Sequence, residues 1–284
     1  MYLRATVSRA ATLLAKRPAL FGRLLLAKIK TSRRMPPLPA RKRIRGVVFE
    51  YDLGRYHGTA PMYFGSYALL ITEAMKRFLN PGDVFLDVGA NIGYLSAVAA
   101  GLVGKRGQVH CFEPVPAYFD RLQNLANLNP GFAILPNFCA AGEVAGQCTI
   151  YITREAGQNT VVPAYQPDSE ITSTLDVPVV RLDSYIADRG VHRVALIKID
   201  AEGFEFPVLK GLQGYFEQTS HRPPIICEIA PRAYPLMGKK LSELADYMAA
   251  YGYSARDLID HSTRVDLASI EHVDDVLFLA ATSA

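Results

Sequence analysis

Hydrophobic and polar positions follow two alternating periods through most of the chain after residue 46. Short apolar runs, typical of buried strands, recur between longer stretches in which apolar side chains fall at helical spacing. Turns rich in Gly, Pro and Asn separate the two kinds of segment. This order of strand and helix predicts right-handed βαβ units, which build a parallel sheet with helices on both faces.

The positions of these runs predict the individual elements. We expect strands at 83–88, 108–113, 132–135, 149–152, 177–182, 195–199 and 224–229, a pair within 46–56, and a terminal pair at 253–255 and 275–279. We expect helices at 65–79, 93–103, 118–128, 206–212 and 241–251. The polar segment 154–174 has no sustained periodicity, which predicts a loop that acts as a lid or substrate loop.

The stretch from Asp83 to Ser96 carries the first chemical signal, because an apolar strand passes through Gly89 and Gly93 into a helix. Glycines remove side chains where the backbone turns and a ligand comes close, and a helix start offers unpaired N–H groups. The spacing lacks the Gly-x-Gly-x-x-Gly of dinucleotide sites, and Asp87 would repel a pyrophosphate. A cofactor with an ammonium and a sulfonium, S-adenosylmethionine, suits Asp87 better than NAD does.

The following two strands supply further cofactor candidates. Glu113 ends the next strand roughly 20 residues after the glycines, where a carboxylate can accept both ribose hydroxyls. The alternative is that Glu113 caps the helix that begins after Pro114. Asn137 and Ala140 follow the third strand at the carboxyl end of the sheet, where an adenine could rest.

The apolar strand before Asp200 ends in a cluster of acids. Ligands of open α/β sheets bind outside the carboxyl ends of the strands, so Asp200 and Glu202 are expected to face the same crevice as Gly89. Either acid could accept a proton as a general base, with Glu205 and His57 as further candidates. Alternatively, Asp200 contacts the cofactor and Glu202 caps the following helix.

Two more charged residues bear on this cluster. Glu228 ends another apolar strand, so a metal site of Asp200, Glu202 and Glu228 is an alternative, since hard cations choose oxygen ligands. Clustered strand-end acids are routine in such folds, however, and we expect no metal. Lys198 is expected to pair with one of these acids and not to act as a base, because nearby carboxylates keep it protonated.

Charge divides the chain into two parts. Residues 1–45 carry 13 Lys and Arg and no acid, whereas residues 46–284 carry 18 basic and 27 acidic residues. We therefore predict a basic amphipathic arm and linker over 1–45 and one α/β domain over 46–284. An acidic domain is a poor match for nucleic acid, so no nucleic-acid partner is expected.

The arm interleaves two short apolar segments with Arg and Lys, which leaves three roles open: attachment to an anionic membrane surface, a mitochondrial transit peptide over residues 1–34, or a helix packed on the domain. No apolar run is long enough to cross a membrane, and no convincing signal peptide precedes the domain. The four cysteines lack Cys-x-x-Cys spacing, which indicates reduced thiols. We expect a cytoplasmic protein, peripheral on a membrane if the arm binds lipid.

The stretches DVFLDVGANIGYLS, VHCFEP, VPVVRLDSYI, IKIDAEGFE and DVLFLA together resemble the FkbM family of S-adenosylmethionine-dependent methyltransferases, over about residues 46–281. The resemblance implies a class I methyltransferase, Rossmann-like fold with a mostly parallel seven-stranded sheet and helices on both faces. It also implies methyl transfer to a hydroxyl of a sugar, glycolipid or natural product. The basic helical arm lies outside the resemblance.

The resemblance further assigns roles to residues of the motifs. These are Asp87, Gly89, Asn91 and Gly93 for the methionine end of the cofactor, Glu113 for its ribose, and Asp200 and Glu202 for the reacting centre. Two rival functions are a cofactor- or nucleotide-binding protein without catalysis and an NAD-dependent oxidoreductase. The missing middle glycine and the Asp87 carboxylate argue against the oxidoreductase.

Overall fold

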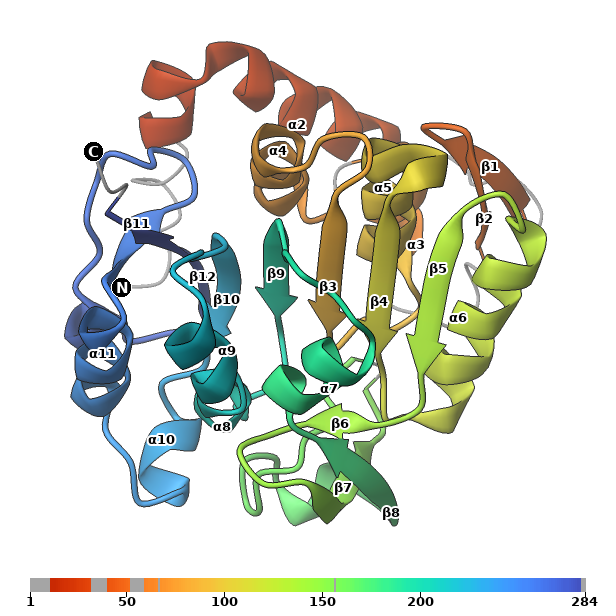
Figure 1. Ribbon diagram of the computed structural model, residues 1–284. Coiled ribbons are helices and arrows are strands. Elements are labelled where there is room, and N and C mark those ends of the chain that lie inside the picture. The colour runs from red at the N-terminus through yellow and green to blue at the C-terminus, as the bar shows by residue number, and fades with distance from the viewer. Residues whose placement is uncertain (1–10, 32–39, 52–58, 66, 156, 282–284) are drawn as a thin grey trace.

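The computed structural model describes residues 11–31, 40–51, 59–65, 67–155 and 157–281, and its centre is a seven-stranded sheet (Figure 1). From one edge to the other the strands are β11 (Tyr253–Asp257), β12 (Asp274–Ala280), β10 (Ile225–Ile229), β9 (Leu196–Ile199), β3 (Val84–Val88), β4 (Gln108–Phe112) and β5 (Ala133–Asn137). Adjacent strands are parallel except β12, which is antiparallel to both of its neighbours. The predicted mostly parallel sheet and its terminal strand pair are confirmed.

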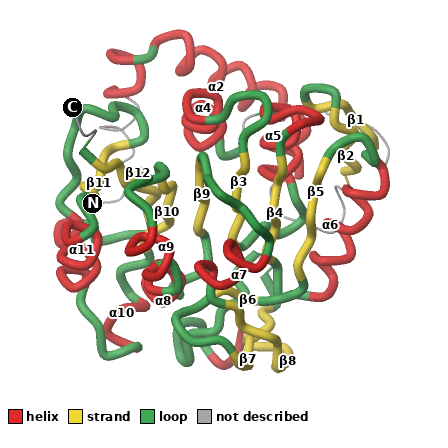
Figure 2. Tube along the Cα trace, in the orientation of Figure 1, coloured by secondary structure: helices red, strands yellow, loops and turns green. Residues whose placement is uncertain are grey.

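Helices cover both faces of this sheet, as the alternation of strand and helix predicts (Figure 2). One face carries α4 (Leu69–Phe78), α5 (Tyr94–Val103) and α6 (Pro116–Leu128). The other carries α7 (Leu182–Asp188), α8 (Glu205–Lys210), α9 (Gln213–Gln218) and α11 (Leu241–Ala250). Each face has its own apolar core, and α5 is buried on nearly every side because its small, apolar residues let it lie close to the strands.

A smaller three-stranded sheet lies below the carboxyl ends of the main strands in Figure 1. It consists of β6 (Ala140–Ala141), β8 (Ile171–Val180) and β7 (Gly146–Thr153). The predicted loop 154–174 therefore extends too far toward the C-terminus, because β8 begins at Ile171, which pairs with Thr153. The remaining segment includes a short 3₁₀ turn at Asp168–Glu170 and a bridge between Thr160 and Tyr151.

The strand pair expected within 46–56 begins earlier than predicted. It is a hairpin of β1 (Ala40–Ile44) and β2 (Val47–Tyr51), and residues 52–58 lie outside the described residues. The turn falls at Arg45 and Gly46, both with positive φ, as a two-residue hairpin turn requires. Basic side chains on β1 obscure its strand pattern, and the proposed boundary at 45/46 coincides with the turn.

The remaining helices are α2 (Pro18–Thr31), α3 (Thr59–Phe64) and α10 (Ala233–Leu236). Residues 11–16 are also helical, and Leu13 and Leu20 of the arm are buried against Leu69 and Ile259 of the domain. The described part of the arm is thus packed on the domain. No helix in the described ranges is both long enough and apolar enough to span a membrane, and all four cysteines are free thiols.

Candidate active site

A cavity of about 390 Å³ lies at the carboxyl ends of β9, β3 and β4, which are neighbours in the sheet. The turn after β3, the first residues after β4, the segment at β6 and the acids after β9 all contribute to its wall. Six predicted site residues line it: Gly89, Asn91, Glu113, Ala140, Asp200 and Glu202. The expected convergence of two strand ends is confirmed, because parallel neighbours end at the same edge of a sheet.

The turn after β3 is held by its two neighbouring strands. The N–H groups of Gly89 and Ala90 donate to the carbonyl oxygen of Phe112, at 3.0 and 3.1 Å. Gly89 has a φ of 71°, and a Cβ added to it would lie 1.7 Å from the carbonyl oxygen of Asp200. Glycine is therefore required here by the close approach of the β9 end as well as by the left-handed backbone.

Gly93 is required for helix packing and not, as Gly89 is, for the approach of the β9 end. It precedes α5 with a φ of 82°, and an added Cβ would lie 2.7 Å from a methyl carbon of Leu122 on α6. The structure places Gly93 outside the cavity wall, where it lets α6 pack against the start of α5. Asn91, with a φ of 51°, does line the cavity.

Glu113 joins the glycine turn to the start of α6. Its Oε2 accepts the N–H of Asn91 at 2.8 Å, and its Oε1 accepts the N–H of Val115 at 2.9 Å. The contact to Val115 is the helix-start contact that the capping alternative required. Burial raises the pKa of Glu113 to about 7, although both N–H contacts act in the opposite direction. Each carboxylate oxygen keeps a second lone pair, so Glu113 can accept a ligand hydroxyl as well.

Asp87 lies behind the cavity wall and does not line it. The side chain is completely buried, and its Oδ2 accepts the hydroxyl of Ser96 on α5 at 2.5 Å. Its Oδ1 lies 3.7 Å from Nζ of Lys198 and has no hydrogen-bond partner among the described residues. Burial raises the pKa of Asp87, and Lys198 acts against this shift. Asp87 therefore acts on the cavity through its charge and through Lys198.

Asn137 also lies outside the cavity wall. Its side-chain amide donates to the carbonyl oxygens of Cys111 and Leu135, which fixes the end of β5 against β4. Ala140, the other residue assigned to the adenine, does line the cavity together with Cys139. The structure thus separates these two predicted residues, one in the wall and one beneath it.

Asp200 and Lys198 form the charged edge of the cavity. Nζ of Lys198 lies 3.0 Å from Oδ2 of Asp200 and donates to the carbonyl oxygen of Gly89 at 3.0 Å. Burial by itself lowers the pKa of Lys198, but the carboxylates of Asp200 and Asp87 outweigh it and hold that pKa above the usual value. The prediction that Lys198 pairs with an acid and stays protonated is confirmed.

The other acids of the cluster hold protons more tightly than usual. Burial, followed by the charges of Asp200 and Glu205, raises the pKa of Glu202 to about 9. Burial, followed by the charges of Asp200 and Glu202, raises the pKa of Glu228 to about 11. Burial, with a smaller contribution from Asp200, raises the pKa of Glu205 to about 7. Oε1 of Glu205 accepts the N–H groups of Ala201 and Gly203, which makes it a brace for the turn after β9.

The three acids of the alternative metal site do lie close together. Asp200, Glu202 and Glu228 each place one carboxylate oxygen within 4.8 Å of the others, a spacing that a cation could use. The only ammonium with a described contact to this group is that of Lys198, on Asp200. The grouping agrees with the convergence predicted for strand-end acids and does not by itself identify an ion.

The segment between β7 and β8 covers the cavity, as a lid would. The N–H of Gly157 donates to the hydroxyl of Tyr118 at 2.9 Å, and Oγ1 of Thr160 donates to the carbonyl oxygen of Glu202 at 2.7 Å. Gln158 and Asn159 lie in the cavity wall. Since one lid contact reaches α6 and the other the β9 acids, this segment spans both ends of the site.

Sequence reasoning missed Tyr67 and Tyr118, which both line the cavity. Tyr67 lies between α3 and α4, and burial followed by the charge of Asp200 raises its pKa to about 12. Tyr118 holds the lid from the first turn of α6. A single tyrosine on a helix or loop belongs to no motif, so only the fold could place either residue here.

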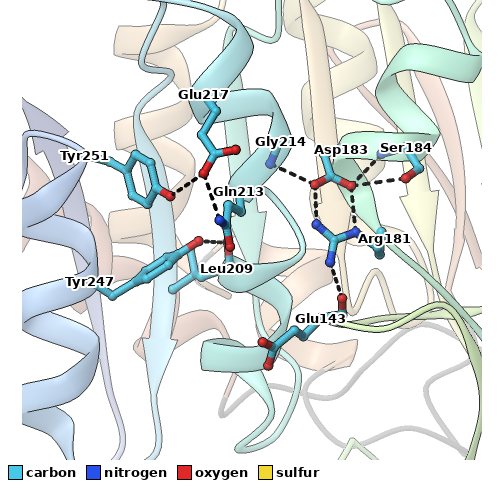
Figure 3. Close-up of polar contacts among 10 residues, drawn as sticks. All are labelled: Glu143, Arg181, Asp183, Ser184, Leu209, Gln213, Gly214, Glu217, Tyr247 and Tyr251. Carbon is cyan, nitrogen blue, oxygen red and sulfur yellow. Dashed lines mark hydrogen bonds and ion pairs between the residues drawn. The ribbon is translucent and has the colours of Figure 1, made fainter.

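A second polar cluster lies away from this cavity, around Asp183 in the first turn of α7 (Figure 3). Arg181 donates to both carboxylate oxygens of Asp183, at 3.1 and 2.6 Å. The N–H groups of Ser184 and Gly214 donate to the same carboxylate, at 2.7 and 2.9 Å. The Asp183 carboxylate therefore holds the start of α9 as well as that of α7.

Comparison with known proteins agrees with this architecture. The sequence model described as the methyltransferase FkbM domain matches residues 87–255. The chain is 32% identical over 164 residues to 31-O-demethyl-FK506 methyltransferase FkbM of Streptomyces tacrolimicus, a match that covers 48% of this chain and 61% of that protein. It is 27% identical over 152 residues to hexuronic acid methyltransferase AglP of Haloferax volcanii, covering 54% and 57%.

The matches thus span only about three fifths of the length of these curated relatives. Among solved structures, that of methyltransferase FkbM from Methylobacillus flagellatus KT aligns with a TM-score of 0.43 at 15% identity, covering 92% of this chain and 60% of that one. The family assignment rests on the domain match, which covers more than half of the chain. The chain belongs to the FkbM methyltransferase family, for which S-adenosylmethionine is the cofactor.

Proposed function

We propose that this protein transfers a methyl group from S-adenosylmethionine to a hydroxyl of a small acceptor, of the sugar, glycolipid or natural-product class. One observation carries the proposal: the glycine turn, Glu113 and the acids after β9 line one cavity. A binding protein without catalysis would need the turn and Glu113 but would have no use for acids at the far end.

The residues present fit this cofactor. Asp87 and Asp200 flank the turn and share the single cation Lys198, so the local charge favours a ligand that carries an ammonium and a sulfonium. The pyrophosphate of NAD would meet these carboxylates instead, with no Gly-x-Gly-x-x-Gly turn to receive it. Gly89 and Asn91 would hold the methionine end, and Glu113 would accept the ribose hydroxyls.

When bound, S-adenosylmethionine supplies an electrophilic methyl group whose bonding electrons leave with the sulfur. The chain must then hold the acceptor oxygen in line with that methyl and remove the hydroxyl proton. Asp200 is the acid suited to this step, because it lies in the cavity wall and its side chain is about one third exposed, so an acceptor hydroxyl can reach it. Glu202, with a pKa of about 9, keeps its proton at neutral pH and can donate a hydrogen bond to the acceptor.

The acceptor class is the least constrained part of this proposal. Two relatives are named as methyltransferases of 31-O-demethyl-FK506 and of a hexuronic acid. Carboxyl groups at Asp200 and Glu202, with the hydroxyl of Tyr67, offer the hydrogen-bond partners that a polyhydroxylated ring needs. We therefore favour a sugar ring or a similarly hydroxylated scaffold.

The test has two stages. Calorimetric titration with S-adenosylmethionine and, separately, with NAD should show binding of the first alone. Labelled S-adenosylmethionine should then transfer its methyl group to material in a lipid and glycan extract, and Asp200→Asn should abolish the transfer. Binding of the cofactor with no labelled product from any extract would favour the binding-protein alternative, and binding of NAD alone would favour the oxidoreductase.

We also propose that the basic arm brings the protein to an anionic membrane surface in the cytoplasm. Leu14, Leu25 and Leu26 are each at least half exposed, while Leu13 and Leu20 hold the arm on the domain. The described arm cations Lys16 and Arg23 pair with Asp260 and Glu73, so these two contribute to docking. The remaining basic residues of 1–45 would supply the attraction to lipid.

Vesicle sedimentation tests the membrane proposal directly. The full chain should sediment with anionic vesicles at low salt and less so at high salt, because salt screens surface charge. Leu25→Ser with Leu26→Ser should weaken sedimentation and leave the domain contacts intact. If the full chain stays in the supernatant at low salt, the arm is only a packed helix or a removed transit peptide, which mass analysis of the mature N-terminus decides.

A further inference from the structure

We propose that Lys198 is a positioning residue that keeps the Asp200 carboxylate ionised at the cavity wall and ties the glycine turn to the end of β9. The proposal deepens the function proposed above and rests on it, since Asp200 is the proton acceptor there. It explains why a lysine occupies the middle of an otherwise apolar, fully buried strand.

The ammonium group of Lys198 contacts three separate segments. It lies 3.0 Å from Oδ2 of Asp200 beyond β9 and 3.7 Å from Oδ1 of Asp87 on β3. It donates to the carbonyl oxygen of Gly89, in the turn, at 3.0 Å. An ammonium has three donors and no acceptor; two of them point to the oxygens of Asp200 and Gly89, while Asp87 interacts with Lys198 through charge. Lys198 is only 3% exposed, which leaves water little access to compete.

The pairing of β9 with β3 gives these contacts their origin. Lys198 lies directly opposite Asp87 in the parallel register, so the two side chains belong to neighbouring strands at the same level. Asp200 follows two residues later, where the strand has ended and its side chain faces the cavity. One buried cation can therefore hold a buried acid and a cavity acid at once.

Several other charged or titratable groups act on this pair. These groups are Glu113 just after β4, Glu202 in the turn after β9, Glu205 on α8, Glu228 on β10 and Tyr67 before α4. Each of them becomes negative when it ionises. The positive charge of Lys198 opposes the upward pKa shifts that burial causes in Asp87, Glu113 and Glu202.

The carboxyl groups of this cluster cannot all be ionised at the same time, because negative charges at short range repel one another. The direct contact of Lys198 with Asp200 selects Asp200 as the acid that stays ionised. Glu202 and Glu228 have no such partner and retain their protons at neutral pH. Lys198 thus determines which acid accepts the acceptor proton.

The experiment compares three variants by carbon-13 NMR of the carboxyl groups, in which Asp200 is assigned by the loss of its resonance in Asp200→Asn. In Lys198→Met, the titration midpoint of Asp200 should move up by about one to three pH units, because its counter-ion is gone. Lys198→Arg keeps the charge and should move it much less. Lys210→Met, which breaks an exposed pair with Glu143, is the matched control and should not move it.

Asp87→Asn provides a test of opposite sign. It removes the competing carboxylate, so Lys198 is shared by one acid fewer and the Asp200 midpoint should move down. Direct repulsion between the Asp87 and Asp200 carboxylates predicts the same downward direction, so the comparison of Lys198→Met with Lys198→Arg decides the proposal. If Lys198→Met does not fold, the double variant Lys198→Met with Asp87→Asn removes the buried carboxylate together with its cation, and its Asp200 midpoint should lie above that of Asp87→Asn alone.

Calorimetry with S-adenosylmethionine tests the link to the turn. Lys198→Met should bind the cofactor at least about tenfold more weakly than Lys198→Arg, because the Gly89 carbonyl loses its donor. A folded Lys198→Met chain with an unchanged Asp200 midpoint would overturn the proposal, as would an upward shift in Asp87→Asn. If the unchanged chain does not bind S-adenosylmethionine at all, the proposed function fails while the NMR result still stands on its own.

Discussion

The acid after β8 and the acids after β9 occupy comparable places, since each lies where a strand passes into a helix, but their surroundings are opposite. The Asp183 carboxylate receives donors from Arg181, Ser184 and Gly214, and these outweigh its burial and lower its pKa (Figure 3). Of Asp200, Glu202 and Glu228, only Asp200 has a described contact with a cation, Lys198, and the pKa values of both glutamates are raised.

Asp183 therefore has a structural role, whereas the acids after β9 are available to a ligand. A carboxylate whose lone pairs are filled by donors of its own chain stabilises the fold and has little left to offer a ligand. Buried acids with too few partners destabilise the fold, and they are found where a site needs them. Both clusters belong to motifs of the family resemblance, so the motif alone does not distinguish the two uses.

The largest expected effect comes from the glycines that face the two clusters. In Gly89→Ala the new Cβ would lie 1.7 Å from the backbone oxygen of Asp200, which cannot move without distorting β9. We expect the loss of S-adenosylmethionine binding, measured by calorimetry, or failure to fold. Gly214→Ala is the matched change, since its Cβ would lie 2.9 Å from Oδ2 of Asp183.

Gly214→Ala should cost about 1–3 kcal/mol of unfolding free energy, as overpacking does, and should leave cofactor affinity unchanged. A folded Gly89→Ala chain that binds the cofactor normally would contradict the assignment of this turn to the cofactor site.

Asp200→Asn should have the next largest effect, on turnover alone. The amide keeps the shape of the carboxylate but cannot accept a proton, so methyl transfer should fall about 10²–10⁴-fold. Cofactor affinity, from the same calorimetric titration, should change much less. Equal losses in turnover and affinity would instead make Asp200 a cofactor ligand, which is the alternative left open by the sequence.

Asp183→Ala should show the reverse pattern. It removes the charged hydrogen bonds of Arg181 and the acceptor for the N–H of Gly214, so urea unfolding should report a loss of about 2 kcal/mol. Binding of S-adenosylmethionine should be preserved, because the cluster lies outside the cavity wall. Weaker cofactor binding with unchanged stability would mean that the two clusters had been assigned to the wrong roles.

The smallest effect concerns the pH dependence of stability. Glu202 and Glu228 have folded-state pKa values of about 9 and 11, above the ordinary value of 4.5, so between about pH 5 and pH 9 the folded chain holds more protons than the unfolded chain. Stability should therefore fall as pH rises through this window.

Urea unfolding at several pH values can separate the two clusters. Glu228→Gln has no proton to lose and should flatten the fall. The lowered pKa of Asp183 has the opposite sign, since its stabilisation is complete above the unfolded value of 3.8 and is lost only as pH falls through the folded value. Asp183→Asn should therefore leave the slope from pH 5 to pH 9 unchanged, and an unchanged slope in Glu228→Gln would contradict the raised pKa of Glu228.

The sequence by itself determined the order of the elements and the place of the site. Apolar runs and helical spacing predicted the strands of the main sheet and the helices α5, α6 and α11, because those patterns reflect burial on one or both faces. The rule that ligands bind outside the strand ends brought Gly89, Glu113 and Asp200 together correctly. Errors came at β1 and at the start of β8, where exposed, polar residues hide the strand pattern.

Only the tertiary structure decided which residues of the motifs face the cavity. Side chains on a strand alternate between faces and those in a turn do not, so a one-dimensional motif could not show that Asp87, Gly93 and Asn137 lie behind the wall. It could not place Tyr67 in the wall, or show that the predicted lid segment is tied to Tyr118 on α6, because these residues come from distant segments. The charge state of each acid also depends on burial and on neighbours from other strands, which is why the partnership of Lys198 with Asp200 and Asp87 became specific only in the folded chain.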